Sequence, residues 1–374
     1  MDFLRRTWAE IDLRALRDNY TLLRSLIPAS AGITAVVKAD AYGHGAETVA
    51  PALEALGANS FAVSNLDEAA SLRRAGVSAP ILILGNTPPE YAAELASLGI
   101  MTAVTDYETA KALSDRGQNV SVHIKLETGM GRLGIAAHSG ELLDAAAEEM
   151  KRISDLPGIN VAGAFTHFST ADEPCDSLTE MQYGLFTKVC RKAEALGVQL
   201  PVKHCCNSAA ALRHPEFALD SVRLGIVLYG CVPDSSGDSI FSGTGLRPVM
   251  TLKSVVSQVR KYPAGATVSY GAKRLEREAD IAVVCLGYAD GFGRNLSDRG
   301  IALIGGKVCP VVGRVCMDMT MFDVTGLDVR PGDEAVIIGE GLSAEHVAML
   351  SGTINYELLC RVGRRVPRVF LNAK

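Results

Sequence analysis

Short apolar runs alternate with longer amphipathic stretches over the first two-thirds of the chain, and this alternation constrains the fold most. The apolar, β-branched runs begin near Ile33, Ser60, Pro80, Met101, Val120, Val161, Pro201 and Ser221. Segments rich in Ala, Leu and Glu lie between them and end at glycine, as helices often do. Eight strands, each followed by a helix, predict a (β/α)8 barrel with functional side chains at the carboxyl ends of its strands. A doubly wound sheet is the alternative, but no G-x-G-x-x-G motif follows the first run.

The pattern changes after about Ser242, where helical periodicity becomes rare. Runs rich in Val, Gly and Thr follow, separated by turn signals such as Pro331-Gly332-Asp333. We therefore predict an α/β barrel domain over residues 1–242 and a mostly β-strand domain over residues 243–374. The opening run WAEIDL precedes the barrel pattern, so the first dozen or so residues could pair with the β domain.

Composition narrows the class of protein. The chain has 374 residues, 48% hydrophobic and 21% charged, and a net charge of −5, which is typical of a globular protein. The absence of a basic surplus disfavours nucleic-acid binding, and no apolar run approaches the roughly 18 residues of a membrane span. The nine cysteines include no C-x-x-C pair, and the start of the chain lacks the apolar core of a signal peptide. We expect a cytoplasmic enzyme. Without an H-x-H or H-E-x-x-H pattern, we expect no metal.

Lys38 is the first candidate for chemistry, since it ends an apolar strand at the predicted rim of the barrel. Burial there disfavours the ammonium form and lowers the pKa, which suits a Schiff-base or general-base role. An isolated lysine at such a place is more often a side chain that reaches out to solvent. The residues around Lys38 therefore decide its interpretation.

The string VVKADAYGHG at 36–45 resembles the cofactor-lysine segment of alanine racemases, pyridoxal-phosphate enzymes with a barrel and a β domain. Eight further strings follow in the order of that family: TGMGRLG at 128–134, THF at 166–168, NSA at 207–209, RLGI at 223–226, VSYG at 268–271, GYADG at 287–291, GRVCMD at 313–318 and INYE at 354–357. The resemblance runs from Trp8 to about Val366. Each string alone is weak, but nine in register across two domains are specific.

The resemblance implies that Lys38 holds pyridoxal 5'-phosphate and then acts as a base on one face of the substrate Cα. The amides of Gly225 and Ile226 would follow the last barrel strand, where this fold often binds phosphate. Cofactor-binding hydroxyls would come from Tyr42, Ser208 and Tyr356. Taken alone, Ser208 is equally well interpreted as the N-cap of a helix.

Arg223 resembles the residue that faces the pyridine nitrogen. Because an arginine does not readily give up a proton, it leaves that nitrogen unprotonated and weakens the ring as an electron sink, which favours racemisation over decarboxylation or transamination. Arg132 would contact the phenolic oxygen of the cofactor and the substrate carboxylate. Lys125, which is carbamylated in many relatives, would steady Arg132, and Glu127 is an alternative anion for that task.

Racemisation needs a second base, and Tyr270 matches the tyrosine of the family in that role. A free tyrosine has a pKa of about 10, so it needs neighbours that stabilise the phenolate. His167, bridging towards Arg223, resembles such a neighbour, although alone it is better interpreted as a core histidine. Cys316 resembles a wall of the substrate pocket, and the residues near the substrate carboxylate would be Met317 and Asp318.

These inferences predict a cytoplasmic alanine racemase that interconverts L- and D-alanine and supplies D-alanine for peptidoglycan. By resemblance it would be a homodimer with shared active sites, in which Lys38 works with Tyr270 of the partner subunit. A serine racemase of the same family is the nearest alternative, although such relatives tend to carry a smaller polar residue in place of Tyr356. A non-catalytic pyridoxal-phosphate carrier would need no β domain, and a decarboxylase would be expected to carry a carboxylate in place of Arg223.

Overall fold

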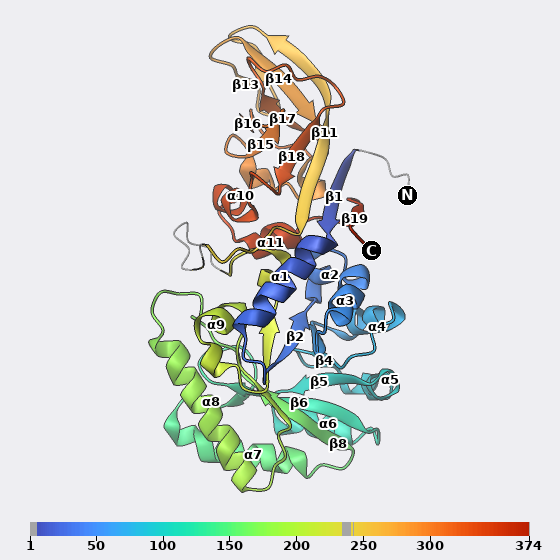
Figure 1. The fold of residues 1–374 in the computed structure, drawn as a ribbon, viewed down its shortest axis with the longest axis vertical. Coiled ribbons are helices and arrows are strands. Elements are labelled where there is room, and N and C mark those ends of the chain that lie inside the picture. The colour runs from blue at the N-terminus through green and yellow to red at the C-terminus, as the bar shows by residue number, and fades with distance from the viewer. Residues whose placement is uncertain (1–5, 234–240, 242, 374) are drawn as a thin grey trace. The chain divides into compact units, whose positions relative to one another are not determined.

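The computed structural model describes residues 6–233, 241 and 243–373 (Figure 1). The chain divides into two compact units. A barrel unit comprises residues 20–41 and 46–228, and a β unit comprises residues 1–19, 42–45 and 229–374. The sequence predicts the domain boundary between residues 242 and 243, and residue 242 lies outside the described residues. Among the described residues, no helix has the length and apolar character needed to cross a membrane.

The barrel unit contains eight parallel strands in the order β10-β2-β3-β4-β5-β6-β8-β9. They are β2 (Gly32–Val36), β3 (Ser60–Val63), β4 (Ile81–Ile83), β5 (Ile100–Val104), β6 (Val120–Glu127), β8 (Ile159–Phe165), β9 (Val202–His204) and β10 (Ser221–Leu224). Backbone hydrogen bonds from Asp220 to Lys203 (3.1 Å) and from Arg223 to Cys206 (3.0 Å) link the segments of β9 and β10, so the barrel is nearly closed. The predicted (β/α)8 barrel is therefore confirmed.

Helices follow most of these strands, and their apolar faces explain why they form. In α7, the residues Leu143, Ala146, Ala147, Met150 and Ile153 are buried at helical spacing. The side chains of Asn65 and Asp106 cap α4 and α6. Besides the turn α2 (Lys38–Gly43), the helices of the first two-thirds of the chain are α1 (Leu13–Leu26), α3 (Ala46–Ala55), α4 (Leu66–Arg74), α5 (Ala92–Leu98), α6 (Tyr107–Ser114), α7 (Leu143–Ser154), α8 (Ser177–Ala195) and α9 (Ser208–Arg213).

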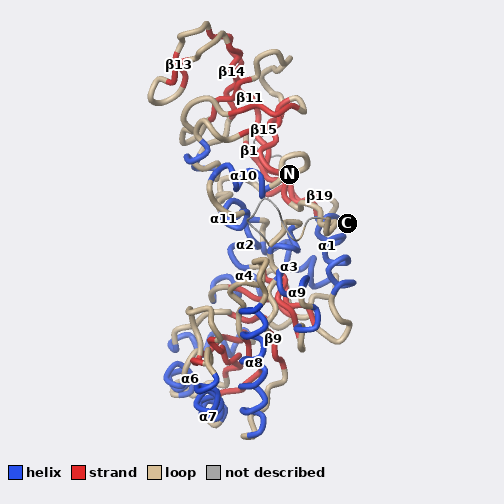
Figure 2. Tube along the Cα trace, turned by 90° about the vertical axis from the view of Figure 1, so that its left-hand side faces the viewer, coloured by secondary structure: helices blue, strands red, loops and turns tan. Residues whose placement is uncertain are grey.

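The β unit is built around the long strand β11 (Met250–Tyr262), and Figure 2 shows more strand than helix there. This strand pairs antiparallel with β1 (Thr7–Asp12), β14 (Ala279–Val284) and β18 (Glu334–Ile338). The opening run WAEIDL thus lies in this sheet, where β1 also pairs with β19 (Arg368–Leu371). The remaining elements are β12 (Thr267–Val268), β13 (Lys273–Arg274), β15 (Ile301–Ile304), β16 (Lys307–Pro310), β17 (Thr320–Asp323), α10 (Ala344–Ser351) and α11 (Asn355–Cys360).

The turn α2 (Lys38–Gly43) has an unusual backbone. Four successive residues, Ala39 to Tyr42, have φ between 52° and 55°, the left-handed region that costs an L-residue roughly 1–2 kcal/mol. Hydrogen bonds hold the turn: the Ala39 amide donates to Glu68 (2.8 Å), and the Asp40 carboxylate accepts from the Ala46 amide (2.7 Å). The strained turn begins directly at Lys38, so it determines the direction in which the chain leaves that lysine.

Replacing Ala39 with glycine should therefore stabilise the protein. Ala39 is exposed and loses little packing, so relief of the left-handed strain should outweigh the added unfolded-state entropy, raising the free energy of unfolding by about 0.5–1 kcal/mol. The control Ala145→Gly lies at an exposed position in the right-handed helix α7, where it should cost about 0.5–1 kcal/mol. Urea denaturation measures both, and equal losses would contradict the left-handed turn.

Candidate active site

Cationic side chains gather at one rim of the barrel unit. Lys38 follows β2, Lys125 lies in β6, Arg223 lies in β10, and Arg132 lies in the loop after β6. Burial lowers the pKa of His167 well below its usual value, and the positive charges of these four residues lower it further. The barrel therefore brings together five of the residues singled out by the sequence: four cationic side chains and the neutral imidazole of His167.

Arg223 is the most constrained of these residues, with 3% of its surface exposed. Its Nη1 donates to the carbonyl of His204 (3.1 Å) and to His204 Nδ1 (2.8 Å). Its Nη2 donates to the carbonyls of Thr166 (2.8 Å) and Cys205 (2.9 Å) and lies 3.4 Å from His167 Nδ1. No hydrogen bond among the described residues uses its Nε. Burial lowers the pKa of Arg223 to about 10, so the guanidinium stays charged at neutral pH.

Two histidines that sequence reasoning missed continue this network. His204 Nε2 lies 3.0 Å from His123 Nδ1. Because Arg223 donates to His204 Nδ1, the proton of His204 is on Nε2 and is donated to His123. Burial, reinforced by Arg223, lowers the pKa of His123 to about 4 and that of His204 well below its usual value, so both stay neutral. The only signal in the sequence was a histidine on each strand flanking β8.

Gly163 on β8 makes room for this histidine pair. A Cβ at this position would lie 2.7 Å from Cε1 of His123 and 2.2 Å from the Val202 carbonyl oxygen. Even the smallest side chain would therefore displace the His123 ring.

A hydroxyl and two backbone amides meet after β10. The Ser208 hydroxyl accepts a hydrogen bond from the Gly225 amide (2.9 Å), and Ile226 begins the 3-10 turn η4 (Ile226–Tyr229), so its amide has no partner inside that turn. The N-cap of α9 is Asn207, whose side chain accepts from the Ala210 amide (2.9 Å). The interpretation of Ser208 as the N-cap is therefore wrong.

Lys125 lies 3% exposed, with its Nζ 4.8 Å from the centre of the Phe165 ring. Burial lowers the pKa of its ammonium to about 7, and Arg223 and Arg132 contribute, while Glu127 opposes them only weakly. The Glu127 carboxylate accepts instead from the amides of Gly129 (2.7 Å) and Gly131 (2.8 Å) and pairs with His138 (3.2 Å). The Glu127 carboxylate is therefore bound within its own turn, and among the described residues Lys125 has no strong anionic neighbour.

Tyr42 and Tyr356 belong to the β unit, where their ring centres lie 6.0 Å apart. Tyr42 is buried between Tyr356 and Tyr229, and the ring centres of Tyr42 and Tyr229 lie 5.2 Å apart. His44 stacks on Tyr229 at 4.5 Å, and its Nδ1 lies 3.0 Å from the Tyr42 carbonyl oxygen. These contacts fix the Tyr42 ring in the β unit.

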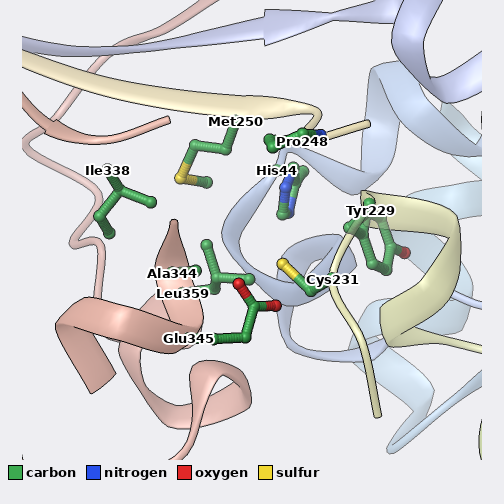
Figure 3. Close-up of a pocket in the computed structure, with 10 residues that line it drawn as sticks. His44, Tyr229, Cys231, Pro248, Met250, Ile338, Ala344, Glu345 and Leu359 are labelled. Carbon is green, nitrogen blue, oxygen red and sulfur yellow. The ribbon is translucent and has the colours of Figure 1, made fainter. Parts of the chain in front are cut away.

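A small cavity lies beside His44 and Tyr229, and Figure 3 shows it lined also by Cys231, Met250 and Glu345. Its volume of about 10 Å³ admits one water molecule at most. Burial, and then Glu345, raise the pKa of the Cys231 thiol well above its usual value. The cavity is therefore too small for a substrate, and its cysteine is not a nucleophile.

Tyr270 lies in the tight turn between β12 and β13, where Ser269 has φ 63° and Gly271 has φ 81°. Its side chain is 69% exposed. The Ser269 hydroxyl donates to the Arg314 carbonyl (2.6 Å) and accepts from the Arg314 amide (3.0 Å). The Tyr270 turn is thus tied to the segment that leads to Met317 and Asp318, both of which are exposed.

The chain matches the family models "Alanine racemase, N-terminal domain" over residues 11–233 and "Alanine racemase, C-terminal domain" over residues 249–370. It belongs to the alanine racemase family. The alanine racemase of Desulfovibrio desulfuricans is 42% identical over 378 residues, which cover 99% of this chain and 100% of the relative. That of Clostridium perfringens (strain SM101 / Type A) is 42% identical over 98% of this chain and 96% of its own.

Solved alanine racemases have the same fold. The structure from Clostridium difficile 630 superposes with a TM-score of 0.93 at 38% identity, covering 100% of this chain and 98% of its own. The structure from Bacillus anthracis with bound L-Ala-P gives a TM-score of 0.91 at 37% identity, covering 100% and 97%. The predicted family, fold class and isomerase class are therefore confirmed.

The depressed pKa of Lys125 predicts a pH dependence of stability. Between about pH 7 and pH 10 the unfolded chain binds a proton at Lys125 that the folded chain does not, so stability should rise with pH by up to about 1.4 kcal/mol per unit from this group. Lys125→Met should flatten the rise by roughly 1 kcal/mol per unit. Lys188→Met, at an exposed position of α8, should not.

The measurement is urea denaturation of the three proteins at intervals from pH 7 to pH 9.5, in carbonate-free buffer. Equal slopes for the wild type and Lys125→Met would show that Lys125 is charged in the folded protein across this range.

Proposed function

We propose that the protein is a pyridoxal-phosphate-dependent alanine racemase that interconverts L- and D-alanine with two bases, Lys38 and Tyr270 of the partner subunit. Membership of the family supports the reaction, and the Arg223 network beside Lys38 is the observation that carries the mechanism. A buried guanidinium, hydrogen-bonded through both terminal nitrogens, retains its charge and its Nε–H for a ligand.

The residues of the barrel rim fit pyridoxal 5'-phosphate. When bound, this cofactor supplies an electron-accepting ring that acidifies the Cα–H of an attached amino acid. The Ser208 hydroxyl and the Ile226 amide would offer donors that a phosphate needs, and the Gly225 amide orients that hydroxyl by donating to its oxygen (2.9 Å). The Nε–H of Arg223 would offer a donor to the ring nitrogen. By resemblance, further hydroxyls come from Tyr42 and Tyr356.

Arg223 favours racemisation over related reactions. Its pKa of about 10 means that it cannot readily protonate a ring nitrogen at neutral pH, whereas a carboxylic acid there could share its proton. A bound ring whose nitrogen meets Arg223 would be a weaker electron sink, which would favour return of a proton to Cα. A decarboxylase or an aminotransferase needs the stronger sink.

The two bases take protons on opposite faces of the substrate Cα. Lys38 exchanges the α-proton of D-alanine, and Tyr270 exchanges that of L-alanine. His167 supports Tyr270: its Nδ1 faces Arg223 Nη2 at 3.4 Å, so its proton is on Nε2 and can be donated to a phenolate. The guanidinium groups of Arg132 and Arg223 also favour an anionic base here.

Lys125 is suited to carbamylation. With a pKa of about 7, roughly half of its amines are neutral at pH 7, and a neutral amine adds carbon dioxide, releasing a proton and leaving a carbamate anion. That anion would neutralise Arg132, a task that Glu127 does not fulfil. Arg132 would then hold the substrate carboxylate through its planar fork of donors.

Substrate and assembly follow from the β-unit residues. The Tyr356 ring would close the pocket over the alanine methyl group, which favours alanine over serine; a serine racemase is the alternative.

The 69% exposure of Tyr270 supports a homodimer in which the Tyr270 of each chain completes the active site of its partner. The relatives named above are bacterial, and D-alanine made in the cytoplasm would supply their peptidoglycan.

The cofactor attachment can be tested by chemical trapping. With pyridoxal phosphate and borohydride, an absorption band near the visible edge should disappear, and peptide mapping should find the cofactor on Lys38. Lys38→Ala should abolish both the label and the racemisation of alanine, whereas the exposed Lys188→Ala should change neither. A label on another lysine would overturn the site, and a Lys38 label without racemase activity in the wild type would support a carrier.

Tyr270→Phe tests the two-base mechanism because it removes only a hydroxyl. Racemisation and deuterium exchange of the L-alanine α-proton should both fall by about 10²–10⁴-fold. Exchange from D-alanine needs only Lys38 and should persist well above that level. The deuterium content of each enantiomer, recovered after incubation in heavy water, measures this. Equal losses for both enantiomers would assign Tyr270 a structural role.

A further inference from the structure

A fully buried carboxylate, Asp290, lies in the β unit within the GYADG string, which has no role in the mechanism above. It ends the turn η5 (Tyr288–Asp290), and its side chain is 0% exposed. It accepts from Arg6 Nη1 (2.9 Å), Arg6 Nη2 (3.3 Å), Arg365 Nε (2.7 Å) and the Gly287 amide (2.9 Å). Burial raises the pKa of Asp290, but these donors together hold it below its usual value, so it stays ionised.

Both arginines also bind Asp318. Arg365 Nη2 donates to Asp318 Oδ1 (2.6 Å), and Arg6 Nη2 donates to the Asp318 carbonyl oxygen (2.9 Å). Two carboxylates and two guanidinium groups thus form a cluster with no net charge. Asp318 is half-exposed, yet its carboxylate is already engaged.

The turn itself holds the neighbouring residues of the same segment. The amides of Tyr288 and Ala289 donate to the carbonyl oxygens of Cys316 (3.0 Å) and Met317 (3.1 Å). These carbonyls approach so closely that a Cβ on Gly287 would lie 2.3 Å from each. The Asp290 side chain fixes the turn η5, and the amides of this turn bind the segment Cys316–Asp318.

We propose that Asp290 is a positioning residue for substrate binding, which acts through Arg6, Arg365 and the turn on the segment Cys316–Asp318. This inference rests on the proposed function and on the family resemblance, which implies that the Met317 amide lies near the substrate carboxylate that Arg132 holds. A free Asp318 carboxylate would repel that anion. Arg365 neutralises it, so Asp318 serves to hold the Met317 amide in place rather than to contact the substrate.

Asp290→Asn keeps the shape of the side chain and removes its charge. KM for alanine should rise about tenfold, the scale of one hydrogen bond to a charged group, with kcat nearly unchanged, since binding is lost equally before and during reaction. Arg365→Lys, which replaces the planar fork of donors by a single ammonium nitrogen, should have the same effect. Asp323→Asn breaks an Arg–Asp pair elsewhere in the β unit (2.9 Å from Arg277) and should leave KM unchanged.

Binding of propionate, which is alanine without its amino group, gives a readout that needs no turnover. Calorimetry on the cofactor-loaded protein should show Kd for propionate rising by the same factor as KM in Asp290→Asn and Arg365→Lys. Asp290→Asn and Asp318→Asn should be less than additive when combined, because they break one network.

Unchanged KM and Kd in folded Asp290→Asn, or in Arg365→Lys if Asp290→Asn does not fold, would overturn the proposal. A fall in kcat with KM unchanged would also overturn it. If the wild type binds propionate with the expected variant dependence but does not racemise alanine, the proposed function fails and the positioning role stands.

Discussion

The burial of the Arg223 guanidinium sets conditions that much of the barrel unit must satisfy. Moving such a charge out of water costs several kcal/mol unless hydrogen bonds replace its hydration. Among the described residues no carboxylate pairs with it, so carbonyl oxygens and imidazole nitrogens do this work. His204 must therefore be neutral and must present Nδ1 as an acceptor. Its Nε2 proton then needs a partner, which is His123, and His123 needs the space that Gly163 leaves.

An unpaired cation also acts on its neighbours. Its field, together with burial, lowers the pKa of Lys125 and of the three histidines around it. The titratable groups at the rim, Lys125 and the three histidines, are thereby shifted towards their neutral forms, although cationic side chains surround them. Such a site stabilises anions, and a phosphate, a carboxylate and a phenolate are the anions that the proposed reaction requires.

The barrel could be predicted because its strands are buried on both faces and interrupted by amphipathic helices, which leaves a pattern in the sequence. All eight strands begin within a residue or two of the predicted positions. The left-handed turn after Lys38 could not be predicted, since nothing local favours positive φ at alanine and tyrosine. The His123–His204 pair depends on which strands are neighbours and on a glycine between them, and the cap of α9 moved by one residue to Asn207.

The two units use arginine in opposite ways, and the difference lies in the partner. Arg223 is surrounded by neutral acceptors, so its charge is solvated by the protein without being cancelled. Arg365 binds the carboxylates of Asp290 and Asp318, and Arg6 binds the Asp290 carboxylate and the Asp318 carbonyl oxygen. Their charge is balanced within the cluster, and their rigid donor geometry remains. A guanidinium group that is to stabilise an anionic ligand must not pair with a carboxylate of the protein. One that only holds neighbouring segments in place is most stable when carboxylates accept its hydrogen bonds. For this reason, the resemblance of a string such as GYADG to the family shows which position of the fold it occupies but not what its residues do. Their role depends on the charged groups that surround them.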